Sequence, residues 1–153
     1  MKRFFSITLY AAFAVVVSSC KPTIPSLSAW GEKMDEMYDC HMDAGLDSTE
    51  LAMALVGTWD WEYVRSVAWT SYESDDAYEG FQLTLEGDGT FIMNQNDTAS
   101  IDGTWQLENS WVEFSLTTQP YAQTLSGALL HCDGYIMFYS SPADGPDHIY
   151  KKQ

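Results

Sequence analysis

The chain has 153 residues, of which 46% are hydrophobic and 14% aromatic, a composition and length typical of one folded domain. It carries 22 acidic and 7 basic residues, which gives a formal net charge of −15 at pH 7. This acidity argues against binding to nucleic acid and against adhesion to an anionic membrane face, because both surfaces repel a negatively charged protein.

The N-terminal segment has the three parts of an export signal. A positive start at Lys2 and Arg3 precedes an apolar stretch over residues 4–17, which is short for a membrane span. The exit, Val17-Ser18-Ser19-Cys20, resembles the bacterial lipobox. The resemblance implies cleavage after residue 19 and lipid attachment to Cys20, which would anchor the mature chain in the bilayer. The alternative is an ordinary signal peptide with an accidental cysteine.

Removal of residues 1–19 takes two positive charges from the total of −15, so the mature chain carries −17. Such a charge predicts a domain that stands off the bilayer on its tether. Lys21 follows Cys20, where an aspartate would favour retention in the inner membrane. We therefore expect a chain anchored in the bacterial envelope, with the outer membrane favoured and its periplasmic or surface side left open.

Cys40 and Cys132 remain as an even pair once Cys20 carries lipid, and export would place them in an oxidising compartment. The pair predicts a disulfide, whose long loop is worth on the order of 4 kcal/mol in chain entropy. A zinc site is the alternative, because Cys40-His41 and His131-Cys132 form mirror-image pairs. Adjacent residues of a strand point to opposite faces, so His131 and Cys132 are poorly placed to share one ion.

Residues 20–47 read as the lipidated cysteine, a tether with two prolines over residues 21–26, and a helical segment. Apolar residues at helical spacing predict a helix over Ser28–Cys40, with Ser28 as its cap. A second short helix is predicted over Ser48–Leu55, with Ser48 as its cap and Gly57 after its end.

From Gly57 onward, short alternating runs are separated by turn residues, which is typical of an antiparallel barrel or sandwich. The tight turns Gly87-Asp88-Gly89, Glu108-Asn109-Ser110 and Asp133-Gly134 predict hairpins. We predict eight strands: Thr58–Trp69, Glu79–Glu86, Thr90–Asn94, Ile101–Leu107, Trp111–Thr117, Gln123–Cys132, Tyr135–Ser140 and His148–Lys152.

Leu55-Val56-Gly57-Thr58-Trp59 resembles the opening motif of the lipocalin-like domains, in which a short helix leads through Gly-x-Trp into the first strand. Gly103-Thr104-Trp105 repeats the motif, and Ile149-Tyr150-Lys151 ends the chain in the family's manner. The resemblance covers residues 48–153 and implies a mainly β fold: a small eight-stranded antiparallel up-and-down barrel, preceded by one or two short helices. Gly57 would allow the sharp turn, and Trp59 would close one end of the barrel.

The departures from the family bear on function. The barrel segment is shorter than a full-size lipocalin, no Thr-Asp-Tyr signature occurs, and Lys151 and Lys152 stand where an arginine is customary. Ligand binding therefore carries over only as a hypothesis. Related small barrels also serve as lysozyme inhibitors and as envelope assembly or stress factors.

In the first predicted strand, Trp59, Trp61, Tyr63 and Arg65 share one face by alternation, and acidic residues occupy the other. The aromatic face is therefore expected to point inward. Arg65, the only arginine of the mature chain, could hold a carboxylate or phosphate head group while the rings hold an apolar tail. Alternatively, Arg65 pairs with an acid at the rim and the interior is filled. The candidate ligand-binding residues are Trp61, Tyr63, Arg65, Phe81, Met93, Trp105 and Phe114.

No metal spacing, nucleophile elbow or phosphate loop occurs, so we expect neither an enzyme nor a cofactor or metal. The leading hypothesis is an anchored barrel that binds a small apolar or amphipathic ligand. The other hypothesis is a filled acidic barrel that acts as an interaction or inhibitor module on a basic protein partner.

Overall fold

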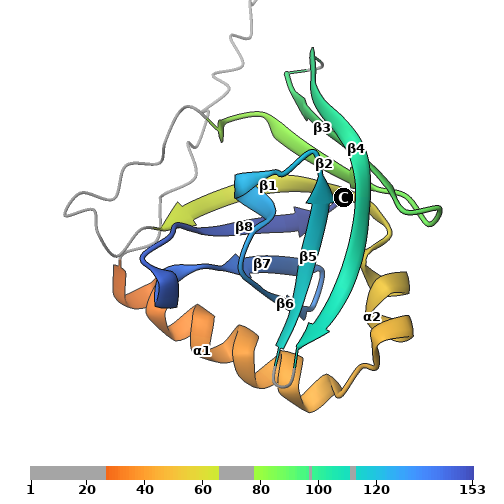
Figure 1. The fold of residues 1–153 in the computed structure, drawn as a ribbon. Coiled ribbons are helices and arrows are strands. Elements are labelled where there is room, and N and C mark those ends of the chain that lie inside the picture. The colour runs from red at the N-terminus through yellow and green to blue at the C-terminus, as the bar shows by residue number, and fades with distance from the viewer. Residues whose placement is uncertain (1–26, 66–77, 97, 111–112) are drawn as a thin grey trace, which may run out of the picture.

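The computed structural model describes residues 27–65, 78–96, 98–110 and 113–153 (Figure 1). The predicted export signal, Cys20 and the tether lie outside these residues and stay predictions. Two helices, α1 (Leu27–Ala44) and α2 (Ser48–Leu55), precede the sheet. Within the described ranges, neither helix combines the length and the apolar character needed to cross a membrane.

Eight strands follow the helices and form one closed antiparallel barrel, in which β1 pairs with β2 on one side and β8 on the other (Figure 1). Each strand is bonded to its neighbours in sequence, which confirms the predicted up-and-down order. The strands are β1 (Gly57–Arg65), β2 (Phe81–Leu85), β3 (Thr90–Gln95), β4 (Thr98–Ser110), β5 (Glu113–Gln119), β6 (Ala128–Cys132), β7 (Tyr135–Tyr139) and β8 (Asp147–Lys152).

The start of α2 corrects the predicted cap by one residue. The Asp47 carboxylate accepts hydrogen bonds from the backbone N–H groups of Thr49 and Glu50, at 2.8 and 2.9 Å, and the Glu50 carboxylate accepts the N–H of Asp47. This capping box makes Asp47 the cap in place of Ser48, because Glu50 stands three residues after it. Helix α1 already begins at Leu27, so Ser28 lies inside it.

The Gly-x-Trp motif closes the α2 end of the barrel. Trp59 is fully buried, and its indole N–H donates to the Leu55 carbonyl of α2 at 2.8 Å. Lys152 lies over the Trp59 ring, 5.0 Å from its centroid, and donates to the Ala54 carbonyl. Lys152 thus makes a cation–π contact and a hydrogen bond at the position where the resemblance implies an arginine. Gly57 has φ +135°, a conformation that favours glycine.

The opposite end of the barrel is filled by a turn that the sequence did not predict. The predicted strand Gln123–Cys132 is wrong in its first half, where residues Gln123–Leu125 form a 3₁₀ turn, η2, and β6 begins only at Ala128. Gly127 has φ +107°, which interrupts the extended backbone. Thr124 and Leu125 are buried, and Leu125 joins the barrel core. The interior is therefore packed from both ends.

A register shift in β1 changes which of its side chains point inward. Trp61 pairs with Tyr150, but the next paired residue is Tyr63, opposite Ile149, so Glu62 is an extra residue. Tyr63 therefore joins Ile149 on the outer face of the barrel, beneath α1. The prediction that Tyr63 shares a face with Trp59 and Trp61 is wrong, because alternation holds only in an unbroken ladder. The cluster on that outer face comprises Met37, Tyr63, Leu130, Met137 and Ile149.

The turn between β4 and β5 lies later than predicted. Strand β4 extends through Glu108–Ser110, and Ser110 is paired with Glu113. Glu108 and Asn109 are likewise paired, with Ser115 and Phe114. A strand with one face in solvent accepts polar side chains, so these residues extend β4 and do not form the turn. Residues 111 and 112 lie outside the described part.

Candidate functional site

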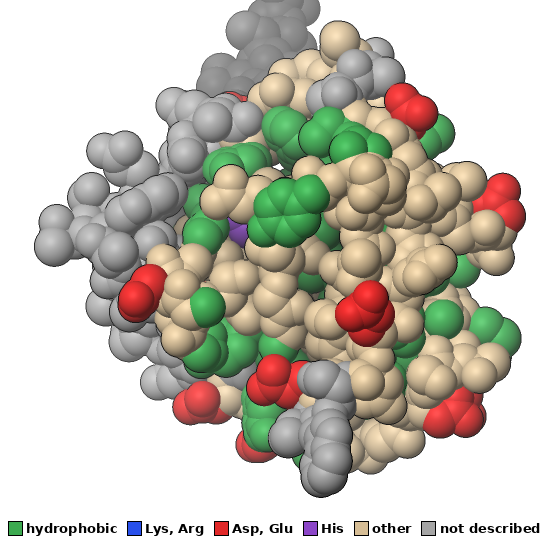
Figure 2. Space-filling view, in the orientation of Figure 1, with side chains coloured by type: hydrophobic (Ala, Val, Ile, Leu, Met, Phe, Trp, Pro, Cys, Tyr) green, Lys and Arg blue, Asp and Glu red, His purple; other side chains and the backbone are tan. Residues whose placement is uncertain are grey.

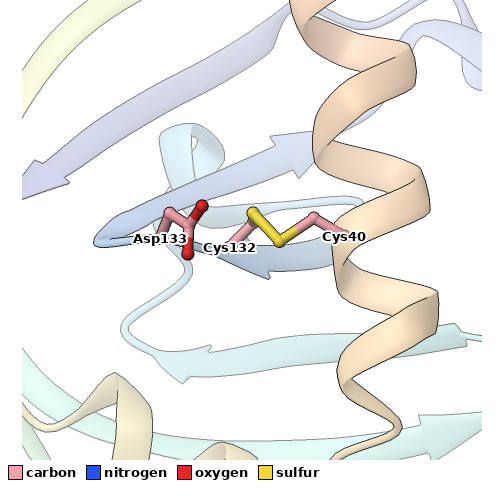
Figure 3. A group of neighbouring side chains, drawn as sticks. All are labelled: Cys40, Cys132 and Asp133. Atoms are coloured by element: carbon pink, nitrogen blue, oxygen red, sulfur yellow. A yellow bond between two sulfur atoms is a disulfide. The ribbon is translucent and has the colours of Figure 1, made fainter.

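The two remaining cysteines form a disulfide between α1 and β6 (Figure 3). The Cα atoms of Cys40 and Cys132 are 5.8 Å apart, and Asp133 lies beside the bond. His131 points the other way, toward the Trp59 ring inside the barrel, which confirms that it and Cys132 occupy opposite faces. A bonded pair carries no thiolate, so the structure supports the disulfide over the zinc alternative.

An open pocket of about 320 Å³ lies where β1 and β2 separate. The two strands are paired only from Gly57 to Asp60, and Asp60 with Gln82 is their last pair. From Trp61 onward, β1 is bonded only to β8. We call this opening the strand-gap pocket; it is lined by Asp60, Trp61, Gly80, Phe81, Gln82, Asn94 and Asn96.

Four rings form a cluster at the strand-gap pocket. The ring of Tyr78 lies 5.5 Å from that of Trp61, 5.7 Å from that of Phe81 and 5.1 Å from that of His148, measured between centroids. These distances fall in the range of favourable aromatic contacts. Trp61 and Phe81 also line the pocket, so the cluster presents part of its aromatic surface there.

His148 lies behind Trp61 and keeps a polar atom without a partner. Its Nδ1 accepts the indole N–H of Trp61 at 3.4 Å, so the neutral ring carries its proton on Nε2. That Nε2 is buried and has no hydrogen-bond partner among the described residues. Burial lowers the pKa of His148 to about 4, so the ring is neutral at pH 7.

Tyr150 follows two residues later on the same face of β8 and is also fully buried. Its hydroxyl makes no hydrogen bond of standard geometry with any described residue. Burial raises the pKa of Tyr150, and the nearby Thr124 hydroxyl opposes this change only in part. Two neighbouring buried groups therefore keep unused hydrogen-bonding capacity, which costs about 1–3 kcal/mol each when nothing satisfies it.

Carboxamides and one carboxylate line the outer side of the pocket. Asp60 accepts hydrogen bonds from the side-chain amide of Gln82, at 3.1 Å, and from that of Gln153, at 3.0 Å. The side chains of Asn94 and Asn96 make no hydrogen bond with any residue in the described ranges. At Gly80 a Cβ atom would overlap the Asn96 amide oxygen, so the glycine permits this close approach.

The structure brings together only two of the predicted ligand-binding residues, Trp61 and Phe81. Met93 and Trp105 are buried in the barrel core, and the indole of Trp105 donates to the Glu86 carbonyl. Phe114 is partly buried and packs edge-on against His41 of α1, with centroids 6.3 Å apart. These three residues form packing contacts and do not line the strand-gap pocket, so the proposal that they bind a ligand stays a prediction.

Tyr63 lies on the outer face, as described above, and the side chain of Arg65 lies outside the described part of the structure. The sequence argument missed Tyr78, His148 and the amide residues. Tyr78 precedes the second strand and His148 is the second residue of the last, so aromatic residues near strand ends were the available signal. The carboxamide side chains of Gln82, Asn94 and Asn96 lie on or just after β2 and β3. In the sequence such polar residues indicate only a solvent-exposed face.

On the face shown in Figure 2, acidic side chains are scattered, hydrophobic ones gather mainly in the upper part, and no coloured lysine or arginine is visible. A second pocket, of about 270 Å³, lies between α1 and the sheet and is lined by Asp35, Tyr38, Leu130, Met137 and Tyr139.

Comparison with known proteins identifies no family. No protein-family model matches the chain, and no curated protein matches it. Among solved structures, it is similar to a DUF4847 family protein from Bacteroides vulgatus, with 15% identity and a TM-score of 0.46. That similarity covers 65% of this chain and 95% of the other. At this identity and TM-score, the likeness bears on neither fold nor function.

Proposed function

We propose that the chain is a lipid-anchored protein of the bacterial envelope whose barrel binds a small amphipathic ligand at the strand-gap pocket. The observation that carries the proposal is the pocket lining, in which the aromatic side chains of Trp61 and Phe81 lie beside Asp60 and three carboxamide side chains. His148 lies behind these rings, and its buried Nε2 has no partner among the described residues, which leaves hydrogen-bonding capacity near the pocket.

The filled interior limits the ligand to a small molecule at the barrel's edge. Trp59, Phe91, Met93 and Phe138 are fully or almost fully buried in the core and leave the axis of the barrel to side chains. A pocket of about 320 Å³ lies near the lower limit for small-molecule sites, which run from about 300 to 1,000 Å³. A long acyl chain would need a deeper cavity.

The anchor rests on the resemblance of Val17-Ser18-Ser19-Cys20 to a lipobox. Cys20→Ala should abolish both labelling by radioactive palmitate and recovery of the protein in the membrane fraction. Lys21→Ala is a matched control that leaves the cysteine in place. Undiminished membrane recovery and labelling of Cys20→Ala would refute the anchor without affecting the ligand hypothesis.

Ligand binding is tested by NMR with a library of small neutral molecules on the purified full chain. A hit at this pocket should perturb the indole signal of Trp61 and should be lost in Trp61→Ala. Tyr121→Ala is the control, because Tyr121 is 71% exposed and does not line the pocket. Binding that survives Trp61→Ala, or no binding at all, would refute the proposed site.

A second candidate function is an interaction module that binds a basic protein through the acidic surface. The filled interior favours it, because such a barrel can act without a ligand. This function predicts a complex with a cationic protein such as lysozyme. The complex should weaken steeply as the salt concentration rises from about 50 to about 500 mM, because the Debye length shortens over this range and the charges are screened. A salt-independent or absent complex would refute it.

A further inference from the structure

We propose that the strand-gap pocket recognises an uncharged sugar, such as the terminal unit of a glycan. This inference rests on the proposed function and adds the chemical class of the ligand. It follows from the pairing of aromatic surface with carboxamides and a held carboxylate in one small opening.

The aromatic part of the lining suits one face of a sugar ring. Trp61 and Phe81 both line the pocket, and Tyr78 packs between them. A sugar ring presents C–H groups of slight positive polarity on one face, and the face of an aromatic ring carries the complementary negative charge. The same rings would also accept other flat ligands, so the class is decided by the polar lining.

The polar lining matches hydroxyl groups, each of which both donates and accepts a hydrogen bond. A carboxamide offers two donors and an acceptor on one planar group, so a single side chain can bond two neighbouring hydroxyls. Asn94 and Asn96 make no hydrogen bond with other described residues, and both line the pocket. Gln82 uses its amide nitrogen on Asp60, which leaves its amide oxygen to accept.

Asp60 is held in place before any ligand arrives. Two amides, from Gln82 and Gln153, donate to its carboxylate at 3.0 to 3.2 Å. A carboxylate has about four acceptor sites, and these three contacts leave about one for a hydroxyl proton of a ligand. Hydrogen bonds to an ionised acceptor are the stronger kind, and an acceptor that is already oriented loses little entropy on binding.

The charge of the site excludes anionic sugars. Among the described residues, the lining contains Asp60 and no lysine or arginine, and the whole chain carries −15. A uronate, a sialic acid or a sugar phosphate would bring a negative charge next to this carboxylate, whose neighbour across the β1–β8 ladder, Lys151, places its ammonium over the Tyr135 ring instead. Neutral sugars carry no such penalty.

The test measures binding of a panel of neutral mono- and disaccharides to the purified full chain, in a detergent without a sugar headgroup. Saturation-transfer NMR detects weak binders, and calorimetry gives the Kd. We expect binding of at least one neutral sugar in the millimolar range or tighter, and at least tenfold weaker binding of the corresponding uronic acid.

Asn94→Ala and Asp60→Asn should each weaken binding of that sugar about tenfold or more, the loss expected for one or two good hydrogen bonds. Ile92→Ala is the matched control, because Ile92 is exposed on the same strand, β3, and does not line the pocket. Each variant is first compared with the parent in thermal unfolding. Asp60→Asn preserves the shape of the side chain, so it still tests the site if Asn94→Ala unfolds.

The outcomes separate the two proposals. If no neutral sugar binds but an aromatic or apolar fragment does, with loss in Trp61→Ala, the sugar assignment is overturned and the small-ligand function stands. If neither class binds, both are overturned. Equal binding of the neutral sugar and its uronic acid would also overturn the assignment, because the argument from Asp60 requires discrimination.

Discussion

The disulfide between Cys40 and Cys132 should contribute a large share of the stability of this chain. The bond joins residues 92 positions apart, so it closes most of the described domain into one loop. For a loop of this length, the chain-entropy relation gives about 4–5 kcal/mol at 25 °C. For a domain of this size, 1 kcal/mol corresponds to about 3–4 °C in Tm. We therefore expect the double variant Cys40→Ser/Cys132→Ser to unfold about 15 °C lower than the oxidised parent.

The structure also says which contacts remain when the bond is absent. Helix α1 would still be attached through Met37, which is buried against Tyr63, Leu130 and Met137 on the outer face of the barrel. We expect the barrel of the variant to stay folded at 25 °C, with α1 the first element to exchange its amide protons.

The assay is thermal unfolding by circular dichroism, together with a count of reactive thiols in a Cys20→Ala background. The oxidised protein should show no reactive thiol and the reduced protein two. Met42→Ala, a change at an exposed position of α1, controls for the effect of altering that helix. A Tm decrease below about 3 °C in the double variant, or two free thiols in the oxidised protein, would refute the reasoning.

Three further predictions concern pH, the closed end and the cap. Burial lowers the pKa of His148 from 6.5 to about 4, so between these pH values the unfolded chain binds the proton more readily than the folded chain does. The free energy of unfolding should therefore be at its full value above pH 6.5. It should decrease toward pH 4 by up to about 3 kcal/mol. Urea unfolding at pH 7 and 4.5 should show a smaller fall in His148→Gln, and an equal fall would contradict the assignment. Trp59→Phe removes the bond to the Leu55 carbonyl and leaves a void, so the free energy of unfolding should decrease by about 2–4 kcal/mol in the same assay; a decrease under about 1 kcal/mol would count against the closing role. Asp47→Ala should cost about 1 kcal/mol and Ser48→Ala clearly less, whereas the reverse order would show that the cap is misassigned.

Local sequence signals anticipated the order of the elements correctly. Helix α2 has the predicted bounds, and all eight strands occur in the predicted order, because turn residues such as Gly87-Asp88-Gly89 and Asp133-Gly134 separate the runs of alternating residues. The cysteine pairing was also predictable, since the two cysteines outside the predicted export signal and lipobox leave one intramolecular pairing.

Three features of the site were decided by tertiary structure. The extra residue at Glu62 moved Tyr63 to the outer face, and alternation counted along a single strand cannot reveal a bulge. The turn η2 fills the end of the barrel opposite α2, where the sequence predicted an unbroken strand, and Leu125 joins the core there. Asn94 and Asn96 line the same pocket as Trp61 only because the pairing of β1 with β2 ends at Asp60.

The sequence by itself therefore determined the strand order, the cysteine pairing and the closing role of Gly57 and Trp59. Each of these depends on residues adjacent in the chain, or on one pair with no competitor. Only the tertiary structure decided where a pocket lies on the barrel. That property depends on which side chains fill the interior and where two neighbouring strands separate, and both are settled by contacts between residues distant in the sequence.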